Sequence, residues 1–299
     1  MTWLPLAVLS ALFLGLYDVA KKAALDGNAV LPVLFGCSLA GAALVLPAGI
    51  ASWTAPGLAA QAGILVEPLT ATGHLLVMAK ACIVTTSWVL TYFAIKHLPI
   101  SIASPLRASA PLFVVLGAVA AMGERPTGHQ WLGIAVMLCA YWAFSALGRE
   151  EGIHFTRNRW VGLLLLGTLV GAASGLYDKH LLQSARLPPM AVQFWFALYG
   201  AALQGLLVAV AWWPRRRAGT PFQWRWSIVA VGALLLVADA FYFRAVAAPL
   251  ALISVVSLTR RSNVVVSFAV GGLAFREKNR LKKAGALAGL VVGVGLLLG

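Results

Sequence analysis

Residues 3–22 read WLPLAVLSALFLGLYDVAKK and residues 159–180 read RWVGLLLLGTLVGAASGLYDKH, two apolar runs in opposite halves of the chain. Each run is close to the roughly 20 residues that an α-helix needs to cross a hydrocarbon core of about 30 Å. Both carry the sequence GLYD near their ends, at 15–18 and again at 175–178. Two membrane-spanning helices with a shared motif predict a duplicated membrane protein.

The composition of the whole chain suits a lipid bilayer and excludes a single water-soluble core. Of the 299 residues, 61% are hydrophobic and 11% are charged, and the mean hydropathy is +0.88. Soluble domains carry about 25% charged residues. The first apolar run has no basic segment before it and no small-residue cleavage site after it. We therefore expect a retained helix rather than a signal peptide.

Apolar runs recur along the chain and predict ten transmembrane helices. The expected fold is an all-α integral membrane protein that crosses the bilayer many times. The predicted spans are 3–24, 30–51, 73–95, 99–121, 129–147, 159–182, 189–212, 226–247, 249–275 and 281–298.

The formal net charge of +14 comes mainly from short connections between the spans. The basic residues that follow odd-numbered spans are Lys21, Lys22, Lys96, Arg149, Arg157, Arg159, Arg215, Arg216, Arg217, Arg225, Arg276, Lys278, Arg280, Lys282 and Lys283. The opposite side holds Arg125 and Arg186. Because basic loops stay in the cytoplasm, both termini are predicted to lie outside it, in a bacterial-type inner membrane. Anionic membrane lipids, not nucleic acid, are the expected partners of these charges.

The GLYD motif belongs to an internal repeat that covers nearly the whole chain. The further matches, in the same order in both halves, are Tyr92-Phe93 and Pro99 with Tyr242-Phe243 and Pro249, then Ser104, Arg107 and Ser109 with Ser257, Arg260 and Ser262, and finally Glu124 with Glu277. We expect one five-helix repeat over 1–148 and a second over 149–299. Because five is an odd number of spans, the second repeat is inverted, and a substrate site is expected between the two.

This order of parts resembles the EamA-type carriers of the drug/metabolite transporter superfamily. In each five-helix half of those carriers, a proline opens the fourth helix and a Gly-Glu pair, here Gly123-Glu124, precedes the fifth. The second half departs from the pattern and reads Phe275-Arg276-Glu277 at the corresponding place. The resemblance implies a central cavity surrounded by the first, third and fourth helices of each half, with the fifth helices at the periphery.

Charged residues deep in the spans are candidates for the substrate site, because a charge near the bilayer centre costs at least about 2.5–3.5 kcal/mol and must face protein or water. Arg107 and Arg260 are repeat partners near mid-depth, and Lys80 and Asp239 lie at similar depths. With Arg261, which we expect to be structural, there are four bases and one acid. This excess predicts an anionic or zwitterionic substrate that binds the arginines. Alternatively, the arginines tie helices together through carbonyl groups or Asp239.

Polar and aromatic residues near these charges complete the predicted binding site. The hydrogen-bonding candidates are Ser104, Ser109, Ser257, Ser262 and Asn263, and the aromatic candidates are Tyr92, Tyr242 and Trp88. The sequence has no clustered Cys or His pattern, so we predict no metal and no cofactor.

The two GLYD motifs also predict gates at opposite ends of the cavity. Inversion places Asp18 toward the cytoplasm and Asp178 toward the outside, next to Tyr17 and Tyr177 respectively. The bases at similar depths are Lys96 for Asp18 and Arg244 for Asp178. Ion pairs that form in alternation would close one end of the cavity at a time.

Two other roles are open to these acids. Asp18 has Lys21 and Lys22 three and four residues further along its own helix and could pair with either of them. Asp178 or Asp239, if buried, could bind the proton that drives transport.

No catalytic pattern accompanies these residues, because the chain lacks GxSxG, HExxH and Walker A sequences. We therefore expect a secondary active transporter, not an enzyme, that exports a small anionic or zwitterionic metabolite such as an amino acid or related carboxylate. The alternative is a flippase for an anionic lipid-linked sugar or polyprenyl phosphate. Glycines spaced by four, at Gly167, Gly171 and Gly175 and at Gly289 and Gly293, predict close packing within a monomer rather than a dimer.

Overall fold

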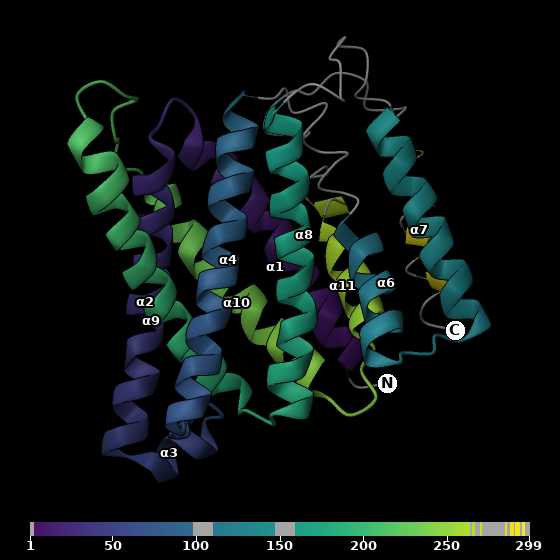
Figure 1. The fold of residues 1–299 in the computed structure, drawn as a ribbon. Helices are drawn as coiled ribbons and strands as arrows, with labels where there is room; N and C mark the ends of the chain where they lie inside the picture. Colours follow the sequence, from purple (N-terminus) through teal and green to yellow (C-terminus); the bar gives the residue numbers. More distant parts are fainter. Residues whose placement is uncertain are drawn as a thin grey trace.

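The structure is a computed structural model that describes residues 3–97, 110–146 and 159–263, together with scattered positions between 265 and 296. Within these residues the chain is helical and contains no strand, and its helices stand side by side as one bundle (Figure 1). The helices are α1 (Trp3–Leu25), α2 (Val30–Thr54), α3 (Pro56–Gln61), α4 (Ala71–His97), α6 (Ala110–Met122), α7 (Gly128–Ala146), α8 (Arg159–Lys179), α9 (Pro189–Leu207), α10 (Trp226–Ala247) and α11 (Ile253–Arg261). A π-helical turn, His180–Ser184, extends α8, and π- and 3₁₀-helical turns, Val208–Trp212 and Trp213–Arg215, extend α9.

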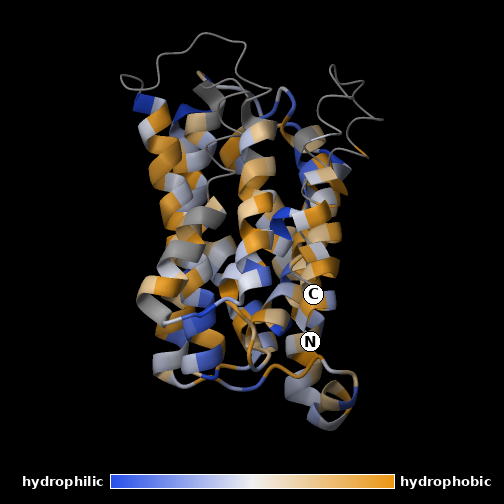
Figure 2. Ribbon diagram, turned by 90° about the vertical axis from the view of Figure 1, so that its right-hand side faces the viewer, coloured by the Kyte–Doolittle hydropathy of each residue, from blue (hydrophilic) through white to orange (hydrophobic). Residues whose placement is uncertain are grey.

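Six helices in the described part of the chain are long and apolar enough to cross a membrane: α1, α2, α4, α8, α9 and α10. Hydrophobic residues predominate along their length (Figure 2). Each corresponds to a predicted span, and the predicted span 129–147 corresponds to the apolar helix α7. The remaining spans, 99–121, 249–275 and 281–298, lie partly outside the described residues. The count of ten helices therefore stays a prediction.

Prolines mark several helix boundaries. Pro189 is the first residue of α9 and Pro56 the first of α3, where a missing N–H group breaks no helical hydrogen bond. The short helix α3 stands in what the hydropathy pattern presents only as a connection between two spans. It lies at the lower end of the bundle in Figure 1, below α2 and α4.

Helices from the two halves pack on each other in matching pairs. Under the predicted repeat, α1, α2, α4 and α6 correspond to α8, α9, α10 and α11. Exchanging the halves turns the α1–α10 contact into the α4–α8 contact, and both are extensive. The α2–α10 contact is related to α4–α9 in the same way, and α1–α11 is related to α6–α8.

Glycines allow the closest of these contacts. A Cβ atom on Gly167 of α8 would lie 2.6 Å from Thr91 Oγ1 of α4, and one on Gly293 would lie 2.4 Å from Met137 Cγ of α7. Neither position has room for a side chain without displacing its neighbour. The predicted packing role of these glycine rows within the chain is confirmed at these positions.

One end of the bundle carries a cluster of arginines and tryptophans. The connections from α1 to α2 and from α9 to α10 both lie at this end, the upper one in Figure 1. Its exposed basic and aromatic residues include Trp213, Arg215, Arg216, Arg217, Trp224 and Trp226. We call this the basic end. Tryptophan and basic residues in this combination are typical of a membrane–water interface.

Candidate functional site

A pocket lies between α2 and α4 of the first half and α9 and α10 of the second. It encloses about 480 Å³, counted out to its open side. Its wall is mainly apolar and aromatic, with Trp88 and Phe196, and small residues such as Gly232 leave room for the space. The polar residues on the wall are Ser38, Thr85, Gln193, Gln204 and Asp239.

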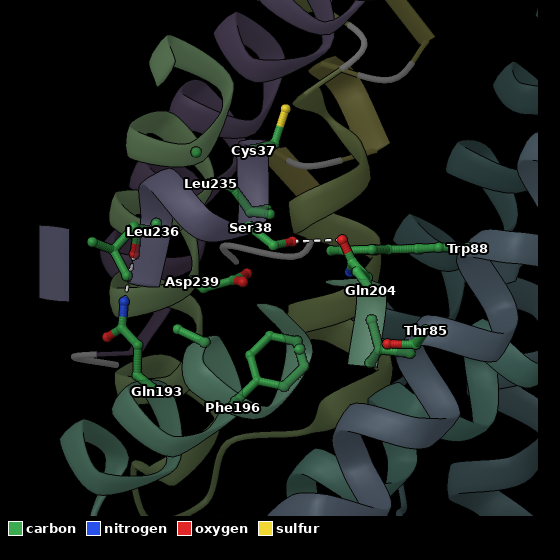
Figure 3. Close-up of a pocket in the computed structure, with 15 residues that line it drawn as sticks. Cys37, Ser38, Thr85, Trp88, Gln193, Phe196, Gln204, Leu235, Leu236 and Asp239 are labelled. Carbon is green, nitrogen blue, oxygen red and sulfur yellow. Dashed lines mark hydrogen bonds between the residues drawn. The ribbon is translucent and has the colours of Figure 1, made fainter. Parts of the chain in front are cut away.

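The polar groups of this pocket are held by neighbouring helices. The Ser38 hydroxyl donates to Gln204 Oε1 at 2.8 Å, which joins α2 to α9. The Gln193 amide donates to the Leu236 carbonyl of α10 at 2.6 Å. Asp239 is the charged residue among the described lining residues, and Figure 3 shows its carboxylate between Gln193 and Gln204.

Asp239 is paired with Arg260, which lies in the last turn of α11. Asp239 and Tyr242 are three residues apart on α10 and so share one face of that helix. The Arg260 guanidinium lies 4.2 Å from the centre of the Tyr242 ring, in a cation–π contact. The Arg260 Nε is buried and has no hydrogen-bond partner among the described residues.

A second ion pair, between Lys80 of α4 and Asp178 of α8, is buried deeper in the bundle. The two side chains are only 3% and 5% exposed. The Lys80 Nζ lies 4.7 Å from the centre of the Phe196 ring and 5.0 Å from that of Phe243. The Tyr242 hydroxyl is next to the Asp178 carboxylate. Tyr242 thus touches both ion pairs, one with its ring and the other with its hydroxyl.

A smaller pocket toward the basic end adjoins the first. It shares Cys37, Ser38, Trp88 and Leu235 with the larger pocket, and Tyr17, Tyr92 and Lys21 line the rest of its polar wall. The Lys21 Nζ lies 4.4 Å from the centre of the Tyr92 ring and 5.3 Å from that of Tyr17. On the same helix, Asp18 accepts a hydrogen bond of 2.6 Å from the Asn263 side chain.

Glu124 holds the beginning of α11 in place. Gly123 has a backbone φ of +66°, which glycine adopts without strain, and it directly follows the last residue of α6. The Glu124 carboxylate accepts hydrogen bonds from the backbone N–H of Ile253 at 2.8 Å and from the Ser254 hydroxyl at 2.6 Å. It also pairs with Lys179 of α8 at 2.6 Å. A carboxylate at a helix N-terminus satisfies free N–H groups and the helix dipole, so Glu124 positions the helix that carries Arg260.

Several predicted site residues come together in the structure. Lys80, Asp239, Arg260 and Tyr242 form the connected set described above, and Trp88 lines both pockets. Tyr92 contacts Lys21, and Asn263 binds Asp18. By contrast, the Ser262 hydroxyl donates locally to the Thr259 carbonyl at 2.7 Å, and Ser257 lines neither pocket. Arg107, Ser104 and Ser109 lie outside the described residues, as does the side chain of Lys96.

The suggested gate pair of Asp178 with Arg244 is not formed. Asp178 lies inside the bundle and binds Lys80, whereas Arg244 is exposed and donates to the Gly63 carbonyl at 3.2 Å. Tyr177 likewise donates to a backbone carbonyl, that of Leu76, at 3.2 Å. The physical reason is direction around the helix: among the described basic residues, Lys80 faces the acid, whereas Arg244 points outward.

Other site residues were not anticipated from the sequence. Ser38, Thr85, Gln193 and Gln204 line the pocket, and their one signal is an uncharged polar group inside an apolar span. Uncharged polar side chains insert into a membrane at a lower cost than charged ones, so they are weaker indicators of a site in the sequence. The described residues contain no group of three or more His, Cys, Asp or Glu side chains placed to hold a metal ion.

Comparison with known proteins agrees with this architecture. Residues 1–146 match the model of the EamA-like transporter family. A solved structure described only as "Crystal structure of protein" superposes with a TM-score of 0.72 at 20% sequence identity, over 99% of this chain and 96% of that one. At this identity the likeness concerns the fold alone. No curated protein matches the chain significantly.

The family match covers α2 and α4, which provide the first half's share of the pocket wall. The superposition covers both halves, so the whole chain shares the fold of that solved structure. Members of the matched family are transporters rather than enzymes. Residues 1–146 of this chain thus match the EamA-like transporter family, which belongs to the drug/metabolite transporter superfamily.

Proposed function

We propose that the protein is a secondary active transporter that exports a small zwitterionic metabolite, such as an amino acid, by alternating access between two inverted repeats, 1–148 and 149–299. The observation that carries this proposal is the Asp239–Arg260 pair at the wall of the pocket. A carboxylate and a guanidinium side by side match the ammonium and carboxylate groups of one amino acid. The substrate would bind both Asp239 and Arg260 and would replace the ion pair between them.

The charge balance favours a zwitterion over a purely anionic substrate. Lys80, one of the four deep bases counted in the sequence, is neutralised by Asp178, an acid that was expected near a helix end. Among the described lining residues, the charge at the pocket itself is that of Asp239. A substrate with only negative charge would be repelled by this carboxylate. An amino acid brings an ammonium group to it and a carboxylate to Arg260.

The lining of the pocket is compatible with such a substrate, because small-molecule sites are mainly apolar with a few polar groups. Gln193 and Gln204 offer further hydrogen bonds, and Trp88 and Phe196 offer apolar contact to a side chain. These groups come from both halves of the chain, as expected for a site that lies between two repeats.

The basic end supports a proposed orientation. Arginine-rich connections remain in the cytoplasm, so we place the basic end there, with both termini outside, in a bacterial-type inner membrane. The smaller pocket, which shares lining residues with the larger one, lies toward this end. In this arrangement an opening on the side of the smaller pocket would receive substrate from the cytoplasm, which suits an exporter.

Counterflow in proteoliposomes tests the proposal. Vesicles loaded with one unlabelled amino acid should take up the same radiolabelled amino acid, and the twenty common amino acids are tested in turn. Asp239→Asn should weaken binding of the transported amino acid by about 10- to 100-fold, the value of a hydrogen bond to a charged group. The same change should not weaken competition by the corresponding acid without its amino group, because that ligand has nothing to offer Asp239.

Glu67→Gln is the matched control, since it removes an exposed carboxylate that does not line the pocket. It should leave both affinities unchanged. If no amino acid exchanges, and the protein instead scrambles a fluorescent polyprenyl phosphate, the transporter assignment fails in favour of a lipid flippase. Equal losses for the amino acid and its deaminated analogue would show that Asp239 does not bind the ammonium group.

A further inference from the structure

The buried Lys80–Asp178 pair lies beside the pocket but does not line it. We propose that this pair is the proton-binding site of the transporter and that protons and substrate move in opposite directions. The inference rests on the proposed amino acid transport and adds to it the coupling ion and the residues that hold it.

The surroundings of the pair suit a change in protonation better than a fixed structural tie. Each buried ion costs several kcal/mol to remove from water, and an apolar pair would join α4 to α8 at least as well. Lys80 lies over the faces of Phe196 and Phe243 as well as against Asp178. Two aromatic faces stabilise an ammonium whose carboxylate has become neutral. Asp178 can therefore accept a proton while Lys80 keeps its charge.

The charged and titratable groups around Asp178 come from a few elements. From α4 it meets Lys80, and from α10 it meets Tyr242 and, within electrostatic range, Asp239. From α11, Arg260 faces the Tyr242 ring instead of the acid. The sequence of α6 contains no titratable side chain.

The neighbours of Asp178 on its own helix are engaged elsewhere. Tyr177 donates to the Leu76 carbonyl, and Lys179 pairs with Glu124. Of these surrounding groups, Asp239 is the one that also lines the pocket. The connection from Asp178 to substrate therefore runs through Asp239.

This connection makes proton and substrate compete. The Asp178 and Asp239 carboxylates repel each other, and a proton on Asp178 relieves that repulsion. An ammonium group of the substrate bound to Asp239 relieves the same repulsion. Whichever of the proton and the substrate binds second therefore gains less binding free energy than it would alone. In addition, a proton on Asp178 breaks its ion pair and leaves the Lys80 ammonium unpaired, which repels the ammonium of the substrate. Since coupling of this kind is reciprocal, bound substrate expels the proton and a bound proton expels substrate.

The proton balance of a transport cycle follows directly. With the site open to one side, Asp178 takes a proton from that side's water and substrate leaves. With the site open to the other side, substrate enters and the proton passes from Asp178 to that side's water. One proton moves in for each substrate molecule that moves out, and no other reactant is needed.

Gradient-driven uptake by proteoliposomes tests the coupling. The probe is the amino acid that gives the strongest counterflow, and the vesicle interior is made more acidic than the medium by one pH unit. One-for-one exchange then accumulates the probe at most about tenfold, and a protonophore abolishes the accumulation. In the Lys80→Met, Asp178→Asn double variant, accumulation should disappear while counterflow persists, because exchange of substrate against substrate needs no proton.

Ser87→Ala is the matched control. It also removes a buried polar contact between α4 and α8, the bond from the Ser87 hydroxyl to the Gly167 carbonyl, but carries no charge. It should keep gradient-driven accumulation. Accumulation that survives in the double variant, or that needs a sodium gradient in the wild type, overturns the coupling proposal and leaves amino acid transport standing. Absence of counterflow from the wild type defeats the transport proposal itself.

A second measurement does not depend on the double variant folding. Purified wild-type protein in weakly buffered detergent solution, with pyranine as pH indicator, should release protons when the probe amino acid is added. The deaminated acid, which lacks the ammonium group, should release none. Proton uptake on addition of the amino acid, or no proton change at saturating probe, contradicts competition between proton and substrate.

Discussion

Tyr242 touches both ion pairs, and its two ends allow their contributions to be separated. Its ring supports the Arg260 guanidinium at 4.2 Å, and its hydroxyl is next to Asp178. Tyr242→Leu removes the ring, so we expect amino acid binding to weaken about 2- to 30-fold, as the loss of a cation–π contact predicts. Tyr242→Phe keeps the ring, and we expect affinity within about twofold of wild type. Equilibrium binding of radiolabelled amino acid to purified protein measures both.

The comparison of Tyr242→Phe with Tyr242→Leu is the control for general damage at this position. If both variants lose affinity equally, the hydroxyl and not the ring positions Arg260. If neither variant loses affinity, the cation–π contact between Arg260 and the Tyr242 ring does not contribute to amino acid binding.

The charged members of the site could be identified residue by residue from the sequence. Lys80, Asp239 and Arg260 stand out because a mid-span charge is costly and needs a partner. Their pairing could not be predicted, because depth along a helix follows from residue number but the neighbouring helix does not. Asp178 illustrates the difference: its partner is Lys80 on α4, not Arg244 on α10.

At the scale of single elements, α11 depends on a residue that precedes α7. Glu124 is bound to the first N–H groups of α11 and to Lys179 of α8. Glu124→Ala leaves these N–H groups and the partly buried Lys179 ammonium without a partner. Breaking a buried ion pair from one side costs about 3–5 kcal/mol, so we expect the melting temperature of the purified protein to fall by roughly 10 °C. Intrinsic tryptophan fluorescence during heating measures the change.

Glu67→Ala is the control for Glu124→Ala, because Glu67 is exposed. An exposed substitution changes stability by at most about 0.5 kcal/mol, so its melting temperature should stay near that of wild type. Similar shifts for the two variants would mean that Glu124 contributes no more than a surface charge. Both residues lie outside helices, so neither substitution changes a helix propensity.

Hydropathy and proline placement predict most helices in the described chain to within a few residues. The run 30–51 became α2, which extends to Thr54, and the run 226–247 became α10 with the same bounds. The helix α3 could not be predicted in this way, because its six residues are too few to show a period. The role of Glu124 was equally hidden, since it becomes visible only when α11 lies next to it.

For the whole molecule, the repeat in the sequence and the packing in the structure agree. The GLYD motif aligns α1 with α8, and these two helices make equivalent contacts, with α10 and α4 respectively. The repeat could be recognised because it keeps residue identities at a few positions. It could not predict where the symmetry is broken. Lys80 has no repeat partner of its own charge, since Ala230 stands at the corresponding position of α10. We therefore assign proton coupling and substrate binding to different residues, although the two halves of the chain are related by the repeat.

The orientation of the bundle is the last expectation, and it belongs to the molecule as a whole. The basic end carries Arg215, Arg216 and Arg217, while α3 lies at the opposite end (Figure 1). Because arginine-rich connections resist translocation, we expect the basic end in the cytoplasm. The measurement is labelling of single cysteines, introduced as Ala218→Cys or Gln61→Cys after Cys37, Cys82 and Cys139 are replaced by alanine. Both new positions are exposed.

A membrane-impermeant maleimide should label Gln61→Cys in intact bacteria and Ala218→Cys only after the membrane is permeabilised. The two variants are controls for each other, since each shows that the reagent reaches its side. The reverse labelling pattern would put the basic end outside and both termini in the cytoplasm. The smaller pocket, which adjoins the larger one toward the basic end, would then face the exterior. An opening on that side would release substrate instead of receiving it, and the same proton–substrate competition would apply.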